Sequence, residues 1–339
     1  MMTLPLTNPD SPERIFAVLG MFETTEALNT ALELDLFTAA ASGPQSAAQI
    51  AAETGASERG VRILCDYLTV QGLLIKSNGL YSNPPDVQRF CNRKSQQYLG
   101  DIRRFLLGQA REQFRRLTEA VKSGGSTTTH ELHGESDHAR WVEFARSMAP
   151  MMFPAALQLA ELVTLPQGES SVLDIAAGHG LFGIQVAARH PGAVVTAQDW
   201  PEVLAVARSN AEKFGVASRF RERPGDAFEV EFGTGFDAVL LPNFLHHFDA
   251  ETIVTLLRKV REALAPAGKV MVLEFIPESD RVSPPGPALF SLVMLATTPR
   301  GEAWTFAEYQ TMLETAGFGD IALHALANGP QSVVSASKA

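Results

Sequence analysis

The sequence predicts an α/β protein whose C-terminal half is a parallel sheet covered by helices. Two features support this prediction. Apolar runs of strand length alternate with helix-length segments from residue 171 to residue 274, and the first two runs flank a glycine-rich turn and a helix. Strands that alternate with helices in this way form parallel sheets, with polar turns at the strand ends.

The N-terminal third predicts a different, mainly helical unit. Apolar residues recur at helical spacing from Ile15 to Phe37. Residues 46–82 then indicate a helix, a turn, a second helix and a small hairpin, which is the order of elements in a winged helix. A DNA-binding winged helix would carry several basic residues on its second helix, where this chain has only Arg59 and Arg62.

The glycine-rich turn after the first strand indicates a nucleotide-cofactor pocket. Gly178, Gly180 and Gly183 have the G-x-G-x-x-G spacing, and Asp199 follows about 20 residues later, which formally matches a dinucleotide site. Asp174, however, ends the preceding strand, and a carboxylate there would repel a pyrophosphate and attract an ammonium group. S-adenosylmethionine (SAM) has an ammonium and a sulfonium and no phosphate, so it fits better. A nicotinamide enzyme and a degenerate scaffold are the alternatives.

Later strand ends supply partners for the rest of this cofactor. Asp199 is in position to accept hydrogen bonds from both ribose hydroxyls, and Trp200 to cover one face of adenine. Asp226 follows the third strand and is in position to accept from the adenine amine, while the backbone of Ala227 would meet a ring nitrogen. A turn residue after Pro-Gly is the alternative reading of Asp226. Ligands of such sheets bind at the carboxyl ends of the strands, where these residues gather.

A histidine and a glutamate at the ends of adjacent strands predict a general base. The fourth strand leads to His246 and His247, just before a helix that starts near Asp249, and Glu274 lies near the end of the next strand. Glu274 would accept from one ring nitrogen of His246 and leave the other to take a proton. O-methyl transfer needs such a base beside the sulfonium, because the methyl group moves by in-line displacement. We assign His247 a structural role.

A metal site is the alternative for these residues, since imidazole and carboxylate suit zinc or iron. No third well-spaced ligand is evident, so we predict no metal. Cys65 and Cys91 form neither a metal motif nor a disulfide framework, as expected for reduced thiols.

Over nearly its whole length the sequence resembles the dimeric class I O-methyltransferases that carry a winged helix, which include plant caffeic acid and hydroxyindole O-methyltransferases and many bacterial small-molecule enzymes. Residues 245–248 correspond to the family's Leu-His-Asp-Trp turn, and Glu274 has the spacing of its orienting glutamate. The resemblance implies a Rossmann-like class I methyltransferase domain, an N-terminal winged-helix dimerisation domain, SAM as methyl donor and S-adenosylhomocysteine as product. It also implies that Asp174, Asp199 and Asp226 contact the cofactor.

The sequence departs from the family pattern at several positions. The first glycine of the cofactor loop is Ala176, which we expect to be tolerated if its backbone φ is negative. Asn243 replaces a lysine often found near the adenine. The family's second catalytic glutamate aligns with Ala303, next to Glu302, and the arginine before the final helix is Trp304. Methyl transfer stays the prediction, while Glu302 is a candidate substitute for the second glutamate.

The resemblance also places apolar residues near the acceptor. Phe144 and Met148 lie on a predicted helix after the polar loop 123–138, and Phe290 and Met294 lie on a helix after a proline-rich loop. Aromatic and methionine stripes at helical spacing are more often core than pocket. As pocket residues, they would favour an apolar, aromatic acceptor.

Composition fits a globular enzyme and disfavours other classes. The 339 residues are 45% hydrophobic and 19% charged, and a net charge of −10 argues against nucleic acid as a partner. The basic stretch from Arg89 to Lys122 is interpreted as the solvated face of an amphipathic helix. No apolar run reaches spanning length and the first residues lack the regions of a signal peptide, so we expect a cytoplasmic protein without a membrane partner.

These observations predict three regions: a winged-helix dimerisation domain at 1–100, a helical connector that contributes to the active-site cleft at 101–155, and a SAM-binding domain at 156–339. The predicted activity is SAM-dependent methyl transfer to a hydroxyl of a small aromatic or secondary-metabolite acceptor by a homodimer. Methylation of carbon or nitrogen on the same scaffold is one alternative. A SAM-binding regulator that uses the winged helix without catalysis is the other.

Overall fold

The computed structural model describes residues 11–127, 135–327 and 329–338. The chain divides into two compact units between Arg103 and Arg104, inside the short helix α7 (Ile102–Leu107). No helix among these described residues is both long and apolar enough to cross a membrane.

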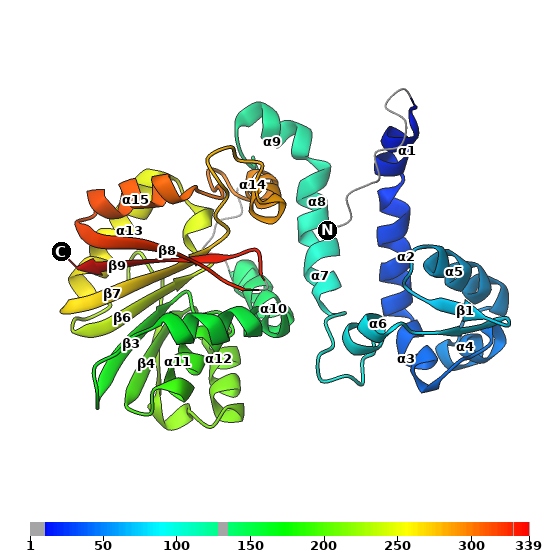
Figure 1. Ribbon diagram of the computed structural model, residues 1–339, viewed down its shortest axis with the longest axis horizontal. Helices are drawn as coiled ribbons and strands as arrows, with labels where there is room; N and C mark the ends of the chain where they lie inside the picture. The colour runs from blue at the N-terminus through cyan, green and yellow to red at the C-terminus, as the bar shows by residue number, and fades with distance from the viewer. Residues whose placement is uncertain (1–10, 128–134, 328, 339) are drawn as a thin grey trace. The chain divides into compact units, whose positions relative to one another are not determined.

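The N-terminal unit is mainly helical, and its α4–α5 pair with the β1–β2 hairpin is the predicted winged helix (Figure 1). Ser46 begins α4 with a capping box in which its hydroxyl accepts from the Gln49 N–H and its own N–H donates to the Gln49 side chain. The elements are α1 (Glu13–Leu19), α2 (Met21–Glu33), α3 (Leu36–Ala39), a 3-10 turn (Ala40–Ser42), α4 (Ala47–Thr54), α5 (Glu58–Val70), β1 (Ile75–Ser77), β2 (Leu80–Ser82) and α6 (Pro85–Phe90).

The helical run predicted from Ile15 to Phe37 is divided into three helices. Gly20 separates α1 from α2, and Asp35 separates α2 from α3 with a left-handed φ of 52°. Leu36 and Phe37 are then fully buried in the core of this unit, beside Ile50 and Leu68 of the winged helix.

The second unit is built on a seven-stranded sheet with the order β5-β4-β3-β6-β7-β9-β8. The first five strands of that order are parallel, whereas β9 runs antiparallel to both β7 and β8. This confirms the predicted Rossmann-like fold. The strands are β3 (Ser170–Ile175), β4 (Ala193–Asp199), β5 (Phe220–Pro224), β6 (Phe236–Pro242), β7 (Leu264–Glu274), β8 (Phe318–Ala325) and β9 (Ser332–Lys338).

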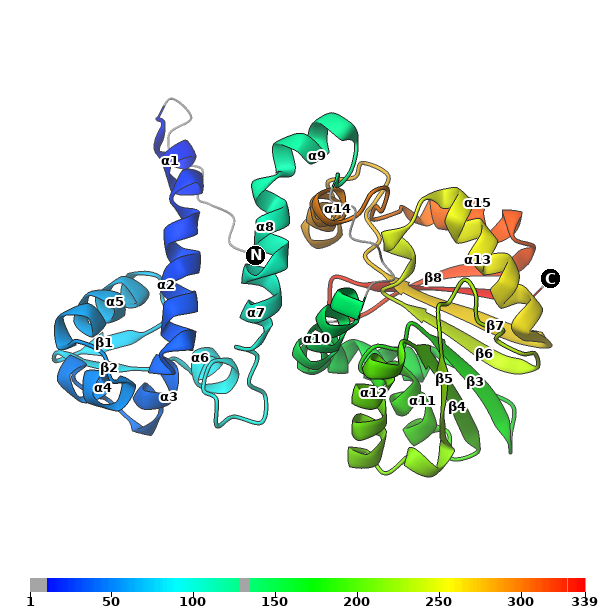
Figure 2. The same ribbon diagram turned by 180° about the vertical axis from the view of Figure 1, so that it is seen from behind.

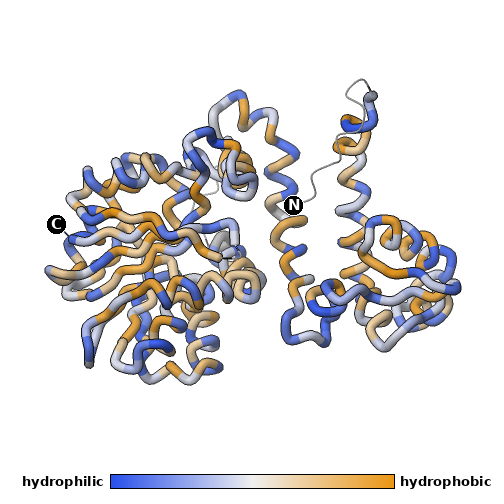
Figure 3. Tube along the Cα trace, in the orientation of Figure 1, coloured by the Kyte–Doolittle hydropathy of each residue, from blue (hydrophilic) through white to orange (hydrophobic). Residues whose placement is uncertain are grey.

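Helices cover both faces of this sheet (Figures 1 and 2). One face packs against α10 (Glu135–Leu162), α11 (Leu181–Arg189) and α12 (Pro201–Lys213), and the other against α13 (Ala250–Ala263) and α15 (Phe306–Thr315). Figure 3 shows the central strands as predominantly hydrophobic, as expected for strands buried on both faces. The predicted helix near Asp249 is α13, which that residue caps by accepting from the Thr252 N–H at 2.9 Å.

The basic stretch differs from the single helix expected there. It forms α7, α8 (Gln109–Arg115) and α9 (Leu117–Ser123), because Gly108 and Arg116 leave helical geometry. The helix α14 (Pro285–Thr297) packs against α8 and α9. Of the predicted loop 123–138, residues 128–134 lie outside the described residues.

Candidate active site

The candidate residues gather at one edge of the sheet. Because β3, β4, β5, β6 and β7 run parallel, the loops that follow them lie at their common carboxyl edge. These loops hold the glycine-rich turn, the carboxylates that the sequence singles out, and the histidine pair.

The glycine-rich loop is held by the end of the neighbouring strand β4. Three successive N–H groups donate to it: that of Ala176 to the side-chain Oε1 of Gln198 at 3.3 Å, that of Ala177 to the Gln198 carbonyl at 3.0 Å, and that of Gly178 to Oδ2 of Asp199 at 2.8 Å. The loop is therefore fixed before any ligand is bound.

Backbone geometry in this loop corrects one expectation. The φ of Ala176 is 52°, so the negative value under which alanine was expected to be tolerated is not found, and alanine here adopts the left-handed conformation that favours glycine. Gly178 and Gly180 also have positive φ, of 57° and 73°. Gly183 is required for another reason: a Cβ there would lie 2.6 Å from Cγ1 of Val195 on β4.

Asp174 lies beneath the loop and is fully buried. Its Oδ2 accepts the Gly183 N–H at 3.0 Å, whereas Oδ1 has no hydrogen-bond partner among the residues that the structure describes. Burial, above all, raises the pKa of this carboxyl to about 8. An unsatisfied, buried carboxylate oxygen below a glycine-rich loop suits a cationic ligand, because a positive charge would restore the ionised form.

Asp199 is also partly committed to the protein. Its Oδ2 accepts from Gly178 and its Oδ1 accepts the Trp200 N–H at 2.7 Å, which leaves further lone pairs on both oxygens. Burial raises its pKa to about 6. The Trp200 indole stacks on His138 of α10 with a centroid separation of 4.5 Å, and His138 Nδ1 lies 3.3 Å from the Glu202 carboxylate.

The turn after β5 is stabilised by its own residues and by α13. Oδ1 of Asp226 accepts the Phe228 N–H at 2.8 Å, so this carboxylate has the turn-forming role considered as the alternative. Lys259 of α13 donates to the carbonyls of Ala227 at 3.1 Å and Phe228 at 2.9 Å. The turn is thereby fixed at both ends.

His246 and Glu274 form a buried pair. The 3-10 turn Leu245–His247 follows β6, and Nδ1 of His246 lies 2.5 Å from Oε2 of Glu274 at the end of β7. The other oxygen of Glu274 accepts the N–H groups of Leu245 at 2.9 Å and His246 at 3.3 Å. The side chains are only 5% and 1% exposed. Glu274 thus fixes both the ring and the backbone of the histidine turn.

The rest of the His246 ring faces an aromatic surface. The Phe290 ring meets it edge-on at 4.8 Å and stacks on Phe275 at 4.0 Å. Among the described residues, Nε2 of His246 has no hydrogen-bond partner. His247 is different: burial first, then His246 and Arg140, lower its pKa well below the usual range, so it stays neutral.

Of the other three predicted pocket residues, Phe144 and Met148 are partly buried like Phe290, and only Met294 is buried. Phe144 contacts Trp141, whose ring meets that of His247 at 5.7 Å. Met148 packs at the margin of the core under α10, and Met294 is buried on α14.

Asn243 has a left-handed φ of 56° and bonds within the protein. Its side chain accepts from Gln331, which precedes β9, and donates to Sδ of Met152 at 3.7 Å. Sequence reasoning missed Gln331 and Gln198, and for Gln198 the available signal was a polar residue at the end of a buried apolar strand.

Glu302, the candidate substitute for the second glutamate, is engaged in an ion pair. Its carboxylate pairs with Arg281 at 2.6 Å and is 39% exposed, while Ala303 beside it is fully buried. Among the described residues no group of three His, Cys, Asp or Glu side chains is arranged to hold a metal ion.

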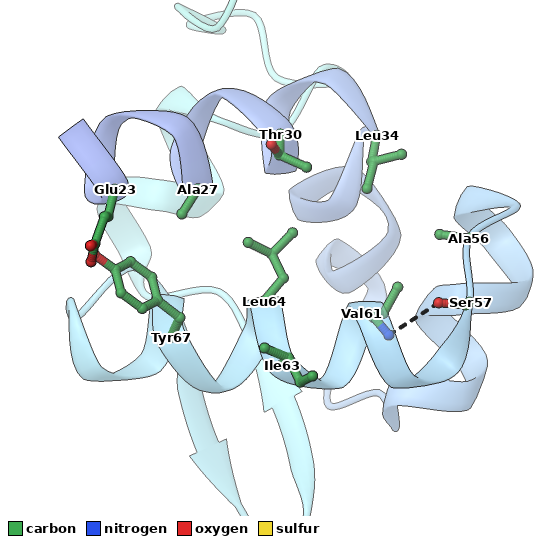
Figure 4. Close-up of a pocket in the computed structure, with 11 residues that line it drawn as sticks. Glu23, Ala27, Thr30, Leu34, Ala56, Ser57, Val61, Ile63, Leu64 and Tyr67 are labelled. Atoms are coloured by element: carbon green, nitrogen blue, oxygen red, sulfur yellow. Dashed lines mark hydrogen bonds between the residues drawn. The ribbon is translucent and has the colours of Figure 1, made fainter.

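A cavity of about 520 Å³ lies within the N-terminal unit, between α2 and α5 (Figure 4). Its walls are mostly apolar, and Tyr67 and Glu23 lie at one end. None of the residues discussed above lines it.

Comparison with known proteins decides the family. The sequence model of the O-methyltransferase domain matches residues 111–319, and that of the O-methyltransferase dimerisation domain matches residues 16–91. This chain belongs to the O-methyltransferase family.

Relatives of this O-methyltransferase align over most of its length. The 3-hydroxy-5-methyl-1-naphthoate 3-O-methyltransferase of Streptomyces sahachiroi is 29% identical, over 93% of this chain and 92% of its own. A solved structure from Nostoc punctiforme, described as a candidate O-methyltransferase, is 47% identical with a TM-score of 0.93, covering 98% of this chain and all of its own. Human N-acetylserotonin methyltransferase, solved with SAM, shares the fold at a TM-score of 0.85 and 22% identity, over 99% of both chains.

Proposed function

We propose that this O-methyltransferase transfers a methyl group from SAM to a hydroxyl of a small aromatic acceptor, with His246 as general base. The buried His246–Glu274 pair carries the proposal, because it offers one oriented imidazole nitrogen, without a hydrogen-bond partner in the described part of the chain, beside the loops of a nucleotide-type site. The naphthoate enzyme among the relatives acts on an acceptor of this class.

The residues at the strand ends fit SAM. Asp199 retains lone pairs for the ribose hydroxyls, and the Asp226 carboxylate, in the turn after β5, would accept from the adenine amine beside the backbone of Ala227. The unsatisfied oxygen of Asp174 favours the ammonium, and the left-handed turn of Gly178 and Gly180 would bring the loop backbone to the methionine portion.

Trp200, Ala176 and Asn243 complete the proposed cofactor surface, each with a limit set by its contacts. His138 covers one face of Trp200, so adenine would use another part of the indole. The N–H of Ala176 already donates to Gln198, so Ala176 would offer the cofactor only its backbone carbonyl. Asn243 would line the cofactor surface while its side-chain oxygen stays hydrogen-bonded to Gln331. When bound, SAM supplies an electrophilic methyl group on sulfur.

The protein's part in the reaction is positioning and proton transfer. Glu274 would accept the Nδ1–H of His246 and thereby orient the ring so that Nε2 is the nitrogen that takes a proton. With SAM bound, Nε2 would take the proton of the acceptor hydroxyl as that oxygen receives the methyl group. Phe290, edge-on to the imidazole, provides an apolar wall for an aromatic acceptor.

We also propose that residues 101–155 act as a connector that supplies part of this site. Trp141 on α10 contacts His247, and Phe144 lies against Trp141. A carbon or nitrogen acceptor could use the same base, so the structure of the methylated product separates these reactions.

A homodimer is the proposed assembly. Large apolar side chains at the start of the matched dimerisation domain and just before it are 46% to 67% exposed on α1 and the start of α2: Ile15, Phe16, Val18, Leu19, Met21 and Phe22. Contiguous exposed apolar surface of this kind marks a protein interface. The DNA-binding alternative is weaker, because Arg62 on α5 is paired with Asp66 at 3.1 Å.

Calorimetry with SAM and S-adenosylhomocysteine, followed by a panel of phenolic acceptors, tests the proposal. We expect both compounds to bind and Asp199→Ala to lose most of that binding. Absence of binding by the wild-type protein would overturn the cofactor assignment. Binding without turnover, together with salt-sensitive retention on DNA, would favour the regulator instead.

A further inference from the structure

Gln198 is a buried side chain that joins two loops of the site. It is the penultimate residue of β4 and is only 2% exposed. Its Oε1 accepts the Ala176 N–H of the glycine-rich loop at 3.3 Å, and its Nε2 donates to the Gly225 carbonyl after β5 at 2.6 Å. One carboxamide thus spans from the loop after β3 to the loop after β5.

Backbone bonds reinforce the same connection. The Gln198 carbonyl accepts the Ala177 N–H at 3.0 Å, and the Asp199 carbonyl accepts the Gly225 N–H at 3.1 Å. The end of β4 therefore holds both neighbouring loops, and the side chain of Gln198 is the link that reaches both of them.

The chemistry of the side chain matters at this position. A carboxamide offers one acceptor and one donor, which are the groups that an N–H on one side and a carbonyl on the other require. Ala176 occupies a left-handed conformation that is unfavourable for alanine, and its bond to Gln198 helps to hold it there. Gly225, with φ of 139°, is likewise in a conformation that side chains avoid.

We propose that Gln198 is a positioning residue for the cofactor, which sets the separation between the loop 176–180 and the loop 225–227. This inference rests on the proposed function, in which the first loop holds the methionine end of SAM and the second holds adenine. Because one molecule must contact both loops at once, a change in their separation weakens binding without removing any ligand contact.

Two substitutions separate positioning from simple stability. Gln198→Leu removes both hydrogen bonds and should weaken SAM binding by roughly tenfold or more at every pH. Gln198→Glu keeps both bonds while its carboxyl is protonated, since a carboxylic acid also has one donor and one acceptor. Once ionised, it presents only acceptors to the Gly225 carbonyl, so the loss should grow as the pH rises.

Gln185→Leu is the matched control. Gln185 is a buried glutamine on α11, and its Nε2 has no hydrogen-bond partner. Its loss should change thermal stability and leave SAM affinity unchanged. Each variant is compared with the wild type at the same pH, because other titratable or charged groups lie on the neighbouring elements: Asp174, His179, Asp199, Arg223 and Asp226.

Calorimetric SAM dissociation constants for these proteins decide the matter. The inference predicts a variant-to-wild-type ratio that rises with pH for Gln198→Glu, is high throughout for Gln198→Leu and stays near one for Gln185→Leu. Equal affinity of all folded variants would refute the positioning role while leaving the proposed function intact. Failure of the wild type to bind SAM would refute the proposed function itself.

Discussion

The imidazole of His246 and the carboxylate of Glu274 lie 2.5 Å apart, measured from Nδ1 to Oε2, and both side chains are buried. Because Glu274 also accepts two backbone N–H groups of the histidine turn, it cannot rotate away without leaving them unsatisfied. The pair therefore fixes the orientation of the imidazole. In the proposed function, Nε2 is the ring atom that acts as the base at the edge of the sheet.

SAM affinity should depend on pH through Asp199. Its pKa is raised from 3.8 to about 6. At a pH between these two values, the folded protein without ligand therefore keeps a proton on Asp199 that the unfolded chain has released. The stability that this proton contributes is present below the unfolded pKa and is lost as pH rises through about 6. A ligand that prefers the ionised carboxylate then binds more tightly, by up to about tenfold per pH unit below that pKa.

Calorimetry between about pH 5 and pH 8 measures this dependence. In Asp199→Asn the rise in SAM affinity around pH 6 should disappear. Ionisation of Asp174, whose pKa is raised to about 8, should still give a separate rise in affinity at higher pH. A wild-type affinity that is flat across this range would show that SAM does not select the ionised form of Asp199.

Replacing Ala176 by glycine should stabilise the protein. A φ of 52° has a higher conformational energy for alanine than for glycine. The greater entropy of glycine in the unfolded chain reduces this advantage, so we expect the free energy of unfolding to rise by about 0.5–1 kcal/mol. Urea unfolding measures it. Ala177→Gly, in the same loop but without a left-handed φ, is the control and should be destabilising. Destabilisation by both changes would contradict the strain at Ala176.

Glu302→Gln should leave catalysis nearly unchanged. The carboxylate pairs with Arg281 and is 39% exposed, so its removal should alter the free energy of unfolding by less than about 1 kcal/mol. We expect kcat to stay within about twofold of the wild type, since positioned acids and bases contribute far more than this. A loss of a hundredfold in steady-state assays would instead make Glu302 the second catalytic carboxylate.

The exposed apolar run on α1 should hold two copies together. Phe16→Asp with Leu19→Asp introduces charge into that run, where the side chains are 67% and 65% exposed. Light scattering should then report one 36.6 kDa chain in place of two. Phe214→Asp, which places charge at a 42% exposed phenylalanine of the second unit, should leave the mass at two chains. A double variant that still runs as two chains would move the interface elsewhere.

The local pattern of the sequence was sufficient for the fold and for much of the site. Alternating strands and helices predicted the parallel sheet, and polar residues at successive strand ends predicted Asp174, Asp199 and Asp226 at one edge. The pairing of His246 with Glu274 followed from adjacent strands. These inferences succeed because strand order in such sheets places the loops together whatever their sequence separation.

Other features depend on contacts that no local pattern encodes. The bridge from Gln198 to Gly225 requires the β4–β5 register, and the bond from Gln331 to Asn243 joins residues far apart in the chain. The left-handed φ of Ala176 was missed because alanine usually avoids it. Such long-range bonds hold the loops of the site in place.

Transfer of labelled methyl from SAM to a phenolic acceptor, by the wild type and by His246→Ala, tests the central claim most directly. The account predicts an O-methylated product from the wild type and a turnover lower by about 10² to 10⁴-fold in His246→Ala, with SAM affinity retained. Glu274→Gln should lie between the two. Undiminished O-methylation by folded His246→Ala would contradict the assignment of His246 as the base.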